Sequence, residues 1–282
     1  NSNEYMESQF GVFKMRGVPI NVNYRYLDDE LWYLLDNSDS EAIIFHSSLG
    51  DRVARVAERL PKLKLLIEVD DGGAGQVPNA VAYEDVIANT DPMERIERSE
   101  DDLYMLYTGG TTGMPKGAML SQRYIMFQMT IAPDYVRQTA DDELLTYLPL
   151  CHIAERVFSA WLPLAHGATI NFAESPETVM QNLRELSPTY MFAVPRVWEK
   201  FYSRVTTAMA EATWVGRKAY EWAIRIGTER ADKIIAGRPL SAWERLRYAI
   251  ADRLVFSNIK KVLGLDRTRN AASGAAPISP AL

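Results

Sequence analysis

Short apolar runs separated by amphipathic segments occupy most of the first 195 residues. Residues 42–45 form a continuous apolar run, which is typical of a strand buried on both faces, whereas Leu31, Leu34 and Leu35 recur at helical spacing after an acidic start. We predict strands at 18–22, 42–45, 64–69, 103–107, 144–148, 168–172 and 190–194. Helices are predicted from residue 28 onward and at 51–60, 121–136, 157–164 and 177–186.

After residue 195 the pattern changes from alternating elements to helix alone. Residues 196–263 are almost wholly helical in pattern and are broken only near Gly237 and Pro239. The alternation before that point predicts the fold class α/β, with mostly parallel β-sheets layered with helices. We therefore expect an α/β core with a helical insertion at about 196–263.

The composition excludes several classes of protein. With 47% hydrophobic and 24% charged positions, the 282 residues indicate a globular protein of one to two domains, not a disordered or collagen-like chain. No apolar run approaches the roughly 20 residues of a transmembrane helix. Residues 1–10 are polar, unlike a secretory signal peptide, and the single cysteine excludes an internal disulfide. We therefore expect a cytoplasmic location.

Charge is unevenly distributed along the chain. Residues 1–195 hold 15 Lys and Arg against 29 Asp and Glu, a formal −14, whereas residues 196–282 hold 16 against 8, a formal +8. The positive part is either a set of solvated helix faces or a surface for an anionic partner, such as a membrane surface or an acidic protein. No nucleic-acid-binding motif accompanies it, so we expect no nucleic acid partner.

The strongest chemical signal is the run YTGGTTGMPKG at residues 107–117. It follows the strand predicted at 103–107 and precedes the helix predicted from residue 121. At such a strand-to-helix junction, glycines let the backbone approach an anion and point several N–H groups toward it. Three threonine hydroxyls can bind phosphate oxygens or a hard cation such as Mg²⁺, and Lys116 adds a positive charge. The run therefore predicts a polyphosphate site.

Two common glycine-rich nucleotide motifs do not fit this run. The P-loop pattern requires Ser or Thr after the lysine, where this chain has Gly117, and the spacing G-x-G-x-x-G is not met. The run instead resembles the signature loop YTSGTTGxPKG of the AMP-forming acyl-adenylate superfamily, with Gly109 where serine is most usual. That superfamily contains acyl- and aryl-CoA synthetases, luciferases and adenylation domains of peptide synthetases.

The resemblance extends along the chain. Residues 17–23 resemble an early strand of the family, and the runs LPLCHIAER at 148–156 and AVPRVWEK at 193–200 resemble core motifs of the long-chain fatty acyl-CoA synthetases. SGAAP at 273–277 matches the loop that follows, and members acting on smaller acids are generally shorter in the helical region. The chain is therefore similar to the long-chain fatty acid–CoA ligase branch, with 1–282 as part of its large N-terminal AMP-binding domain.

This resemblance implies roles for particular residues. The loop would bind the β- and γ-phosphates of ATP through Thr108, Gly109, Gly110, Thr111, Thr112, Gly113, Pro115 and Lys116. Thr111 would also contact Mg²⁺, and His152 would border the acyl pocket, so Lys116, Thr111 and His152 are the implied catalytic residues. Gly274, Ala275 and Ala276 would present backbone to the adenine and the acyl carboxylate, where small residues avoid crowding.

Two further features have a structural interpretation beside a functional one. Cys151 next to His152 could be a thiol nucleophile with its base, but adjacent residues at a strand end point to opposite sides, which favours a buried structural thiol. Basic charge interleaved with tryptophan in the helical region is typical of a helix at a lipid interface, although such tryptophans more often pack a core. These residues are Trp198, Trp214, Trp222 and Trp243.

The implied activity is activation of a long-chain fatty acid with ATP to acyl-AMP, followed by transfer to CoA. The sequence contains no Tyr-Gly-x-Thr-Glu motif, no Thr-Gly-Asp motif and no small C-terminal domain with its lysine, so we expect an internal piece of a longer enzyme that alone forms no acyl-CoA. The alternatives are a fatty acyl-AMP ligase that delivers to a carrier protein, a nucleotide- or acyl-binding remnant without turnover, and a membrane-associated scaffold.

Overall fold

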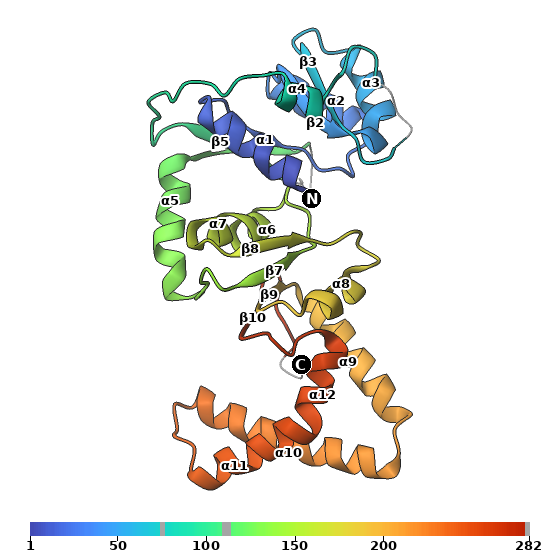
Figure 1. Ribbon diagram of the computed structural model, residues 1–282, viewed down its shortest axis with the longest axis vertical. Coiled ribbons are helices and arrows are strands. Elements are labelled where there is room, and N and C mark those ends of the chain that lie inside the picture. The colour runs from blue at the N-terminus through green and yellow to red at the C-terminus, as the bar shows by residue number, and fades with distance from the viewer. Residues whose placement is uncertain (74–76, 109–113, 280–282) are drawn as a thin grey trace. The chain divides into compact units, whose positions relative to one another are not determined.

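The computed structural model describes residues 1–73, 77–108 and 114–279, which form two compact units (Figure 1). The first contains Asn1–Tyr135 and Leu148–Arg156, and the second contains Val136–Tyr147 and Val157–Leu282. Each unit is built from helices and small sheets, with parallel pairs in every sheet. The predicted α/β class is confirmed.

The first unit contains most of the predicted strands and helices of the N-terminal part. Its elements are α1 (Asn3–Lys14), β1 (Ile20–Asn21), α2 (Asp28–Asn37), β2 (Ala42–His46), α3 (Gly50–Ala57), β3 (Leu65–Val69), β4 (Val81–Ala82), α4 (Tyr83–Ala88), β5 (Leu103–Thr108), β6 (Lys116–Ser121), α5 (Gln122–Ile131) and α6 (Ile153–Arg156). Short 3₁₀ turns at Ser47–Leu49 and Ala132–Asp134 precede α3 and follow α5.

Helices cover both faces of the parallel sheet β2–β3–β4. Ile43 and Phe45 point to one face and pack with the apolar sides of α2 and α3, because alternate residues of a strand face opposite sides. Ile44 and its register partner Ile67 lie on the other face with Tyr83 of α4. This packing explains why β2 reads as an uninterrupted apolar run.

The second unit contains the remaining sheets and the helical region. Its elements are β7 (Glu143–Thr146), a π-helix at Val157–Trp161, α7 (Leu162–His166), β8 (Thr169–Phe172), α8 (Val179–Leu186), β9 (Tyr190–Ala193), α9 (Pro195–Ala210), α10 (Trp214–Ile235), α11 (Ala242–Ala251), a π-helix at Asp252–Phe256, α12 (Ser257–Leu263) and β10 (Asn270–Ser273). β7 pairs with β8 and β9 with β10, both in parallel. The core joins α8, β9, α9 and α12 through Leu183, Met191, Phe201 and Leu263.

Several elements were not predicted, and each lacks the pattern on which the prediction rested. α1 follows Ser2, whose hydroxyl accepts a hydrogen bond from the Tyr5 N–H at 3.3 Å, yet its only buried residue is the polar Gln9. β6 is largely exposed and β10 has four residues, and neither sequence shows apolar alternation. β4 and α4 are also short and follow directly on one another. The predicted strands and helices are otherwise present, with ends shifted by a few residues.

Two glycines of the helical region adopt the left-handed conformation for different reasons. Gly264 ends α12 with φ of 73°, and a Cβ built there would lie 2.3 Å from the carbonyl oxygen of Leu183 in α8. Gly237 follows α10 with φ of 65°, and a Cβ there would meet nothing within 4 Å. Only Gly264 therefore combines a turn with close packing of two helices. In the described part of the chain, no helix is both long and apolar enough to cross a membrane.

Asp142, just before β7, is a buried carboxylate that joins three segments of the second unit. It is 1% exposed and accepts hydrogen bonds from the Thr139 N–H at 2.8 Å, the Thr189 hydroxyl at 2.5 Å and Arg269 Nη2 at 2.5 Å. Burial alone would raise the pKa of Asp142, but the hydrogen bonds from Thr189 and Thr139 outweigh it and hold the pKa below its ordinary value. The ionised carboxylate therefore links β7 to Thr189, next to β9, and to Arg269, next to β10.

We predict that Asp142→Asn lowers the free energy of unfolding of the second unit by about 1–3 kcal/mol, because an amide accepts these bonds more weakly than a carboxylate. Because the folded pKa is lowered, the stabilisation is complete above the unfolded pKa of about 4 and is lost as pH falls through the folded value. The variant should therefore lose less stability on acidification than the unsubstituted chain. Urea unfolding followed by tryptophan fluorescence tests this, since five of the six tryptophans lie in this unit. Asp101→Asn, at an exposed side chain, is the control.

Candidate functional site

The loop predicted to bind phosphate joins two antiparallel strands of the first unit. β5 and β6 pair in a register that sets Thr108 opposite Lys116, and the Thr108 hydroxyl donates to the Lys116 carbonyl at 3.4 Å. The five predicted loop residues between Thr108 and Met114 lie outside the described residues; they are Gly109, Gly110, Thr111, Thr112 and Gly113. The structure therefore defines the two ends of the loop.

The expected strand-to-helix junction is wrong. Six residues of strand β6 separate the loop from α5, so Lys116 begins a strand and does not lie near a helix N-terminus. The Ser121 hydroxyl caps α5 by accepting from the Tyr124 N–H at 3.2 Å, as a helix start predicted at residue 121 requires. The sequence did not predict β6, because this strand is held by backbone pairing with β5 and has no apolar face of its own.

Close packing across the hairpin fixes the backbone next to the loop. Gly117 pairs with the buried Tyr107, and a Cβ added at Gly117 would lie 2.9 Å from the Met105 sulfur and 3.2 Å from Tyr107 Cε2. The Tyr107 hydroxyl in turn donates to Asn37 Oδ1 at 2.7 Å, which ties β5 to the end of α2. A side chain at position 117 would therefore require Met105 and Tyr107 to shift.

Lys116 is available to an anion. Its side chain is exposed and makes no ion pair within residues 1–73, 77–108 and 114–279, whereas the preceding Pro115 is buried. A buried proline at a fixed φ limits the directions in which the chain can leave the loop. An exposed ammonium at a rigid strand end is suited to holding a phosphate group.

His152 lies in a turn and not at a strand end. β7 ends at Thr146, and the His152 N–H donates to the Pro149 carbonyl at 3.0 Å just before α6 begins. Cys151 and His152 are therefore not adjacent residues at the end of a strand, as the sequence analysis assumed. The His152 side chain is exposed, while Cys151 is half-buried and burial raises the pKa of its thiol. A raised thiol pKa disfavours a thiolate nucleophile at neutral pH.

A buried arginine behind this turn is the main feature that the sequence analysis missed. Arg156 is fully buried, and its guanidinium donates to the Leu150 carbonyl at 3.1 Å from Nε and 2.9 Å from Nη2. Nη2 also donates to Asn21 Oδ1 and to the Tyr5 hydroxyl. The only signal in the sequence was a charged residue inside the run at 148–156 that resembled a family motif.

Aromatic rings surround the Arg156 guanidinium. Its central carbon lies 5.2 Å from the ring centroid of Tyr5 and 5.0 Å from that of Tyr104, within the range of cation–π attraction. Burial raises the pKa of Tyr5 to about 12, so its hydroxyl stays protonated and donates to Asn21 Oδ1 at 2.8 Å. Arg156 thus connects α1, β1 and β5 to the turn that bears His152.

The predicted adenine loop lies in the second unit, directly after β10. Gly274 is half-buried, and a Cβ there would lie 3.0 Å from Cε2 of Phe192, whose ring stacks on Phe158 with a centroid distance of 4.5 Å. Packing against the ring of Phe192 therefore already explains the small residue at position 274. Ala275 and Ala276 are exposed, and Ala275 has φ of 69°, which costs a non-glycine residue about 1–2 kcal/mol.

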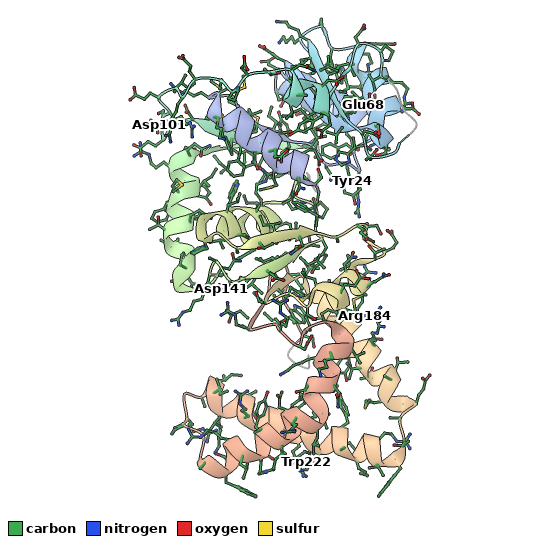
Figure 2. The ribbon with its side chains drawn as sticks, in the orientation of Figure 1. Tyr24, Glu68, Asp101, Asp141, Arg184 and Trp222 are labelled. Carbon is green, nitrogen blue, oxygen red and sulfur yellow. The ribbon has the colours of Figure 1, made fainter. Side chains whose placement is uncertain are left out.

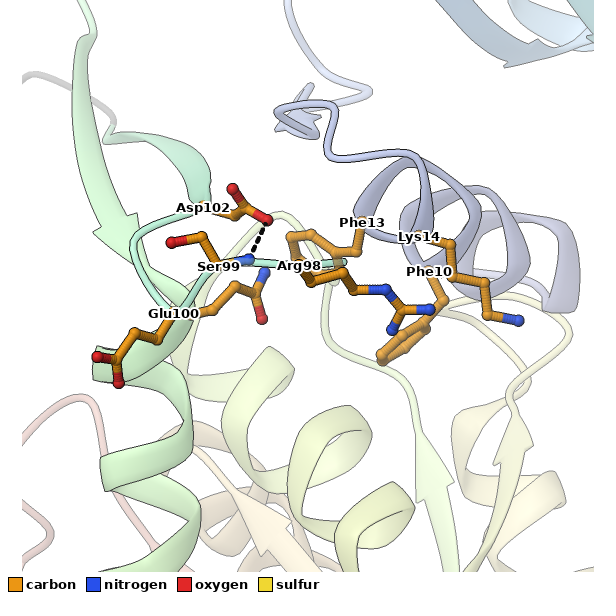
Figure 3. A pocket seen from close by; sticks show the side chains of 8 residues that line it. Phe10, Phe13, Lys14, Arg98, Ser99, Glu100 and Asp102 are labelled. Carbon is orange, nitrogen blue, oxygen red and sulfur yellow. Dashed lines mark hydrogen bonds between the residues drawn. The ribbon is translucent and has the colours of Figure 1, made fainter. Parts of the chain in front are cut away.

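A surface cavity in the first unit lies apart from the predicted site residues. It has a volume of about 330 Å³ and is lined by Phe10, Phe13, Lys14, Arg98, Ser99, Glu100, Asp102 and Gln122 (Figure 3). The Ser99 N–H donates to Asp102 Oδ2 at 3.0 Å at its edge. Among the described residues, no three His, Cys, Asp or Glu side chains come together as a metal site. The predicted Mg²⁺ contact, Thr111, lies outside these residues.

The first unit is thus part of an α/β protein in which the predicted phosphate loop joins two paired strands and an exposed lysine begins the second of them. The chain belongs to the AMP-binding enzyme family, which it matches over residues 1–282. The long-chain-fatty-acid–CoA ligase ACSBG2 of Xenopus laevis is 29% identical over 99% of this chain and 40% of its own length. The medium-chain acyl-CoA ligase Mig of Mycobacterium avium is 44% identical over 44% of this chain and 23% of its own length.

Solved structures show the same fold. The adenylation domain of a carboxylate reductase from Mycobacterium chelonae matches 100% of this chain and 43% of that chain with a TM-score of 0.69 at 17% identity. ATP-bound MatB from Rhodopseudomonas palustris matches 71% of this chain and 39% of that chain with a TM-score of 0.61 at 25% identity. The chain spans about 40% of the length of the curated full-length matches from Xenopus and Gallus gallus. The resemblance to the long-chain fatty acid–CoA ligase branch is confirmed.

We predict that Arg156→Met destabilises the first unit by about 3 kcal/mol, because the buried Leu150 carbonyl loses both guanidinium bonds and Asn21 Oδ1 loses one of its two donors. Hydrogen exchange measured by mass spectrometry should show faster exchange in α1 and residues 148–156 and unchanged exchange in α10. Arg55→Met, which removes an exposed ion pair with Asp28, should leave both regions unchanged. Unaltered protection of residues 148–156 in Arg156→Met would contradict the role assigned to Arg156.

Proposed function

We propose that the protein carrying this chain is a long-chain fatty acid–CoA ligase. It would join a fatty acid to AMP at the expense of ATP, release pyrophosphate and pass the acyl group to CoA. Membership of the AMP-binding family over the whole chain supports this proposal, together with long-chain ligases from Xenopus laevis, Gallus gallus and Drosophila melanogaster as relatives that cover 99–100% of it. The observation that carries it is the loop at 107–117, whose lysine is exposed at the start of a paired strand.

In this proposal, each part of the site has a chemical task. The carboxylate of a fatty acid is a poor electrophile, and attachment to AMP provides a good leaving group. Residues 108–116 would hold the departing pyrophosphate, with Lys116 neutralising charge that develops on it. Thr111 would contact Mg²⁺, which when bound stabilises the negative charge of the phosphates. His152 would border the acyl chain, and Gly274, Ala275 and Ala276 would face the adenine and the carboxylate.

We predict that Lys116→Ala lowers fatty-acid-dependent ATP–pyrophosphate exchange by about 10- to 100-fold, because one charge-assisted hydrogen bond to phosphate is lost. The assay uses the full natural polypeptide that contains this sequence, purified and tested with Mg·ATP. Lys64→Ala removes another exposed lysine, just before β3, and should leave the exchange unchanged. Equal exchange rates in Lys116→Ala and the unsubstituted protein would refute the proposed phosphate contact.

Two measurements separate this function from its rivals. Formation of acyl-CoA in the absence of a carrier protein supports the fatty acid–CoA ligase. Acyl-AMP that accumulates in the presence of CoA, and that is consumed only when a carrier protein is added, supports the acyl-AMP ligase. The intact mass of the natural polypeptide tests the alternative of a nucleotide- or acyl-binding remnant that catalyses no reaction. A mass of about two to two and a half times the 31.9 kDa of this sequence is expected, and a mass near 31.9 kDa would replace the ligase by a nucleotide- or acyl-binding role. We also propose a cytoplasmic location.

A further inference from the structure

Helix α11 has apolar residues on two faces, of which one is used for packing. Tyr248 and Ala251, followed by Val255 and Phe256, pack against α10 through a cluster that includes Trp222 (Figure 2). The contact is close, because a Cβ added at Gly227 of α10 would lie 3.1 Å from Phe256 Cζ. This inner face packs α11 on α10, and ion pairs of Lys233 with Glu244 and of Arg247 with Glu229 also join the two helices.

The second apolar face of α11 points to solvent. Trp243, Leu246, Ile250 and Leu254 are 64%, 51%, 42% and 62% exposed, and their spacing of three and four residues places them along one stripe of the helix and its π-helical extension. Single exposed apolar residues are ordinary, but four in a row along one helix face mark an interaction surface. We call these four residues the outer stripe.

The helices around the outer stripe have excess positive charge. Residues 211–263 hold 11 Lys and Arg against 6 Asp and Glu. Four of the acidic residues are already in ion pairs with neighbouring basic residues: Glu221 with Lys218, Glu229 with Arg247, Glu244 with Lys233, and Asp252 with Lys260. Within the described part of the chain, several exposed basic residues have no carboxylate partner, namely Arg225, Arg238, Arg245, Arg253 and Lys261. Arg245 and Arg253 are on the same helix as the outer stripe.

We propose that the outer stripe and these basic residues form a docking surface for an anionic lipid bilayer. An amphipathic helix with an exposed tryptophan and basic residues beside its apolar face binds at the boundary of headgroups and acyl chains. Each basic residue near an anionic surface adds attraction, whereas the same excess charge opposes pairing of this face with a second copy of the chain. Trp243 of the outer stripe is therefore a surface residue, against the more common core position expected for tryptophan.

The test compares binding of the full natural polypeptide to vesicles of phosphatidylcholine alone and of phosphatidylcholine mixed with phosphatidylglycerol. Tighter binding to the mixed vesicles is expected. Leu246→Glu with Ile250→Glu should weaken that binding by about tenfold or more, and so should Arg245→Gln with Arg253→Gln. Ile87→Glu is the matched control, because Ile87 is an apolar residue of α4 with 60% exposure in the other unit, and it should bind as the unsubstituted protein does.

Three outcomes would overturn the proposal. They are equal vesicle binding by the two double variants and Ile87→Glu, equal binding to both vesicle types, and light scattering that shows a dimer dissociated by Leu246→Glu with Ile250→Glu. Circular dichroism confirms that each variant is folded, and ATP–pyrophosphate exchange with detergent-dispersed fatty acid should be unchanged in all of them. Because binding and exchange are measured separately, failure of this inference is distinguishable from failure of the proposed ligase activity.

Discussion

The buried guanidinium of Arg156 is the interaction on which the first unit depends. A cation removed from water needs close polar or aromatic partners, and here the Leu150 carbonyl, the Tyr5 hydroxyl, the Asn21 amide oxygen and two aromatic rings surround it. These partners come from α1, β1, β5 and the turn before α6, segments up to 151 positions apart in sequence. The planar fork of arginine suits this task, because one side chain can donate in several fixed directions at once. The position of the turn that bears His152 is therefore set by Arg156.

The candidate site combines a rigid frame with exposed chemistry. β5 and β6 hold the loop ends by backbone pairing, Gly117 gives Tyr107 room, and Lys116 remains free of ion pairs among the described residues. In the second unit, Gly274 gives room to Phe192 in the same way. At both places a glycine first serves the packing of the protein itself. In the described residues next to the loop, the backbone position is therefore set by contacts within the protein.

Sequence reasoning succeeded where side-chain chemistry is local and failed where structure depends on distant partners. The apolar run of β2 and the acidic start of α2 were sufficient to predict both elements. β6 could not be predicted, because its exposed residues are held by the register with β5 and not by a pattern of their own. The burial of Arg156 could not be predicted from the sequence, because its partners Tyr5 and Asn21 lie more than a hundred positions away. The position of Trp243 was also not decided by the sequence, because tryptophans in such helices more often pack a core, whereas Trp243 is exposed.

The two left-handed glycines of the helical region impose different limits on how this sequence can diverge. At Gly237 only the backbone angle restricts the choice, so asparagine or aspartate, which tolerate that conformation, remain acceptable replacements. At Gly264 the adjacent backbone of α8 occupies the space of any side chain, so no other residue fits without separating the two helices. The distance between α12 and α8 is therefore set by the missing side chain at position 264, and any substitution there would have to change the packing of these two helices.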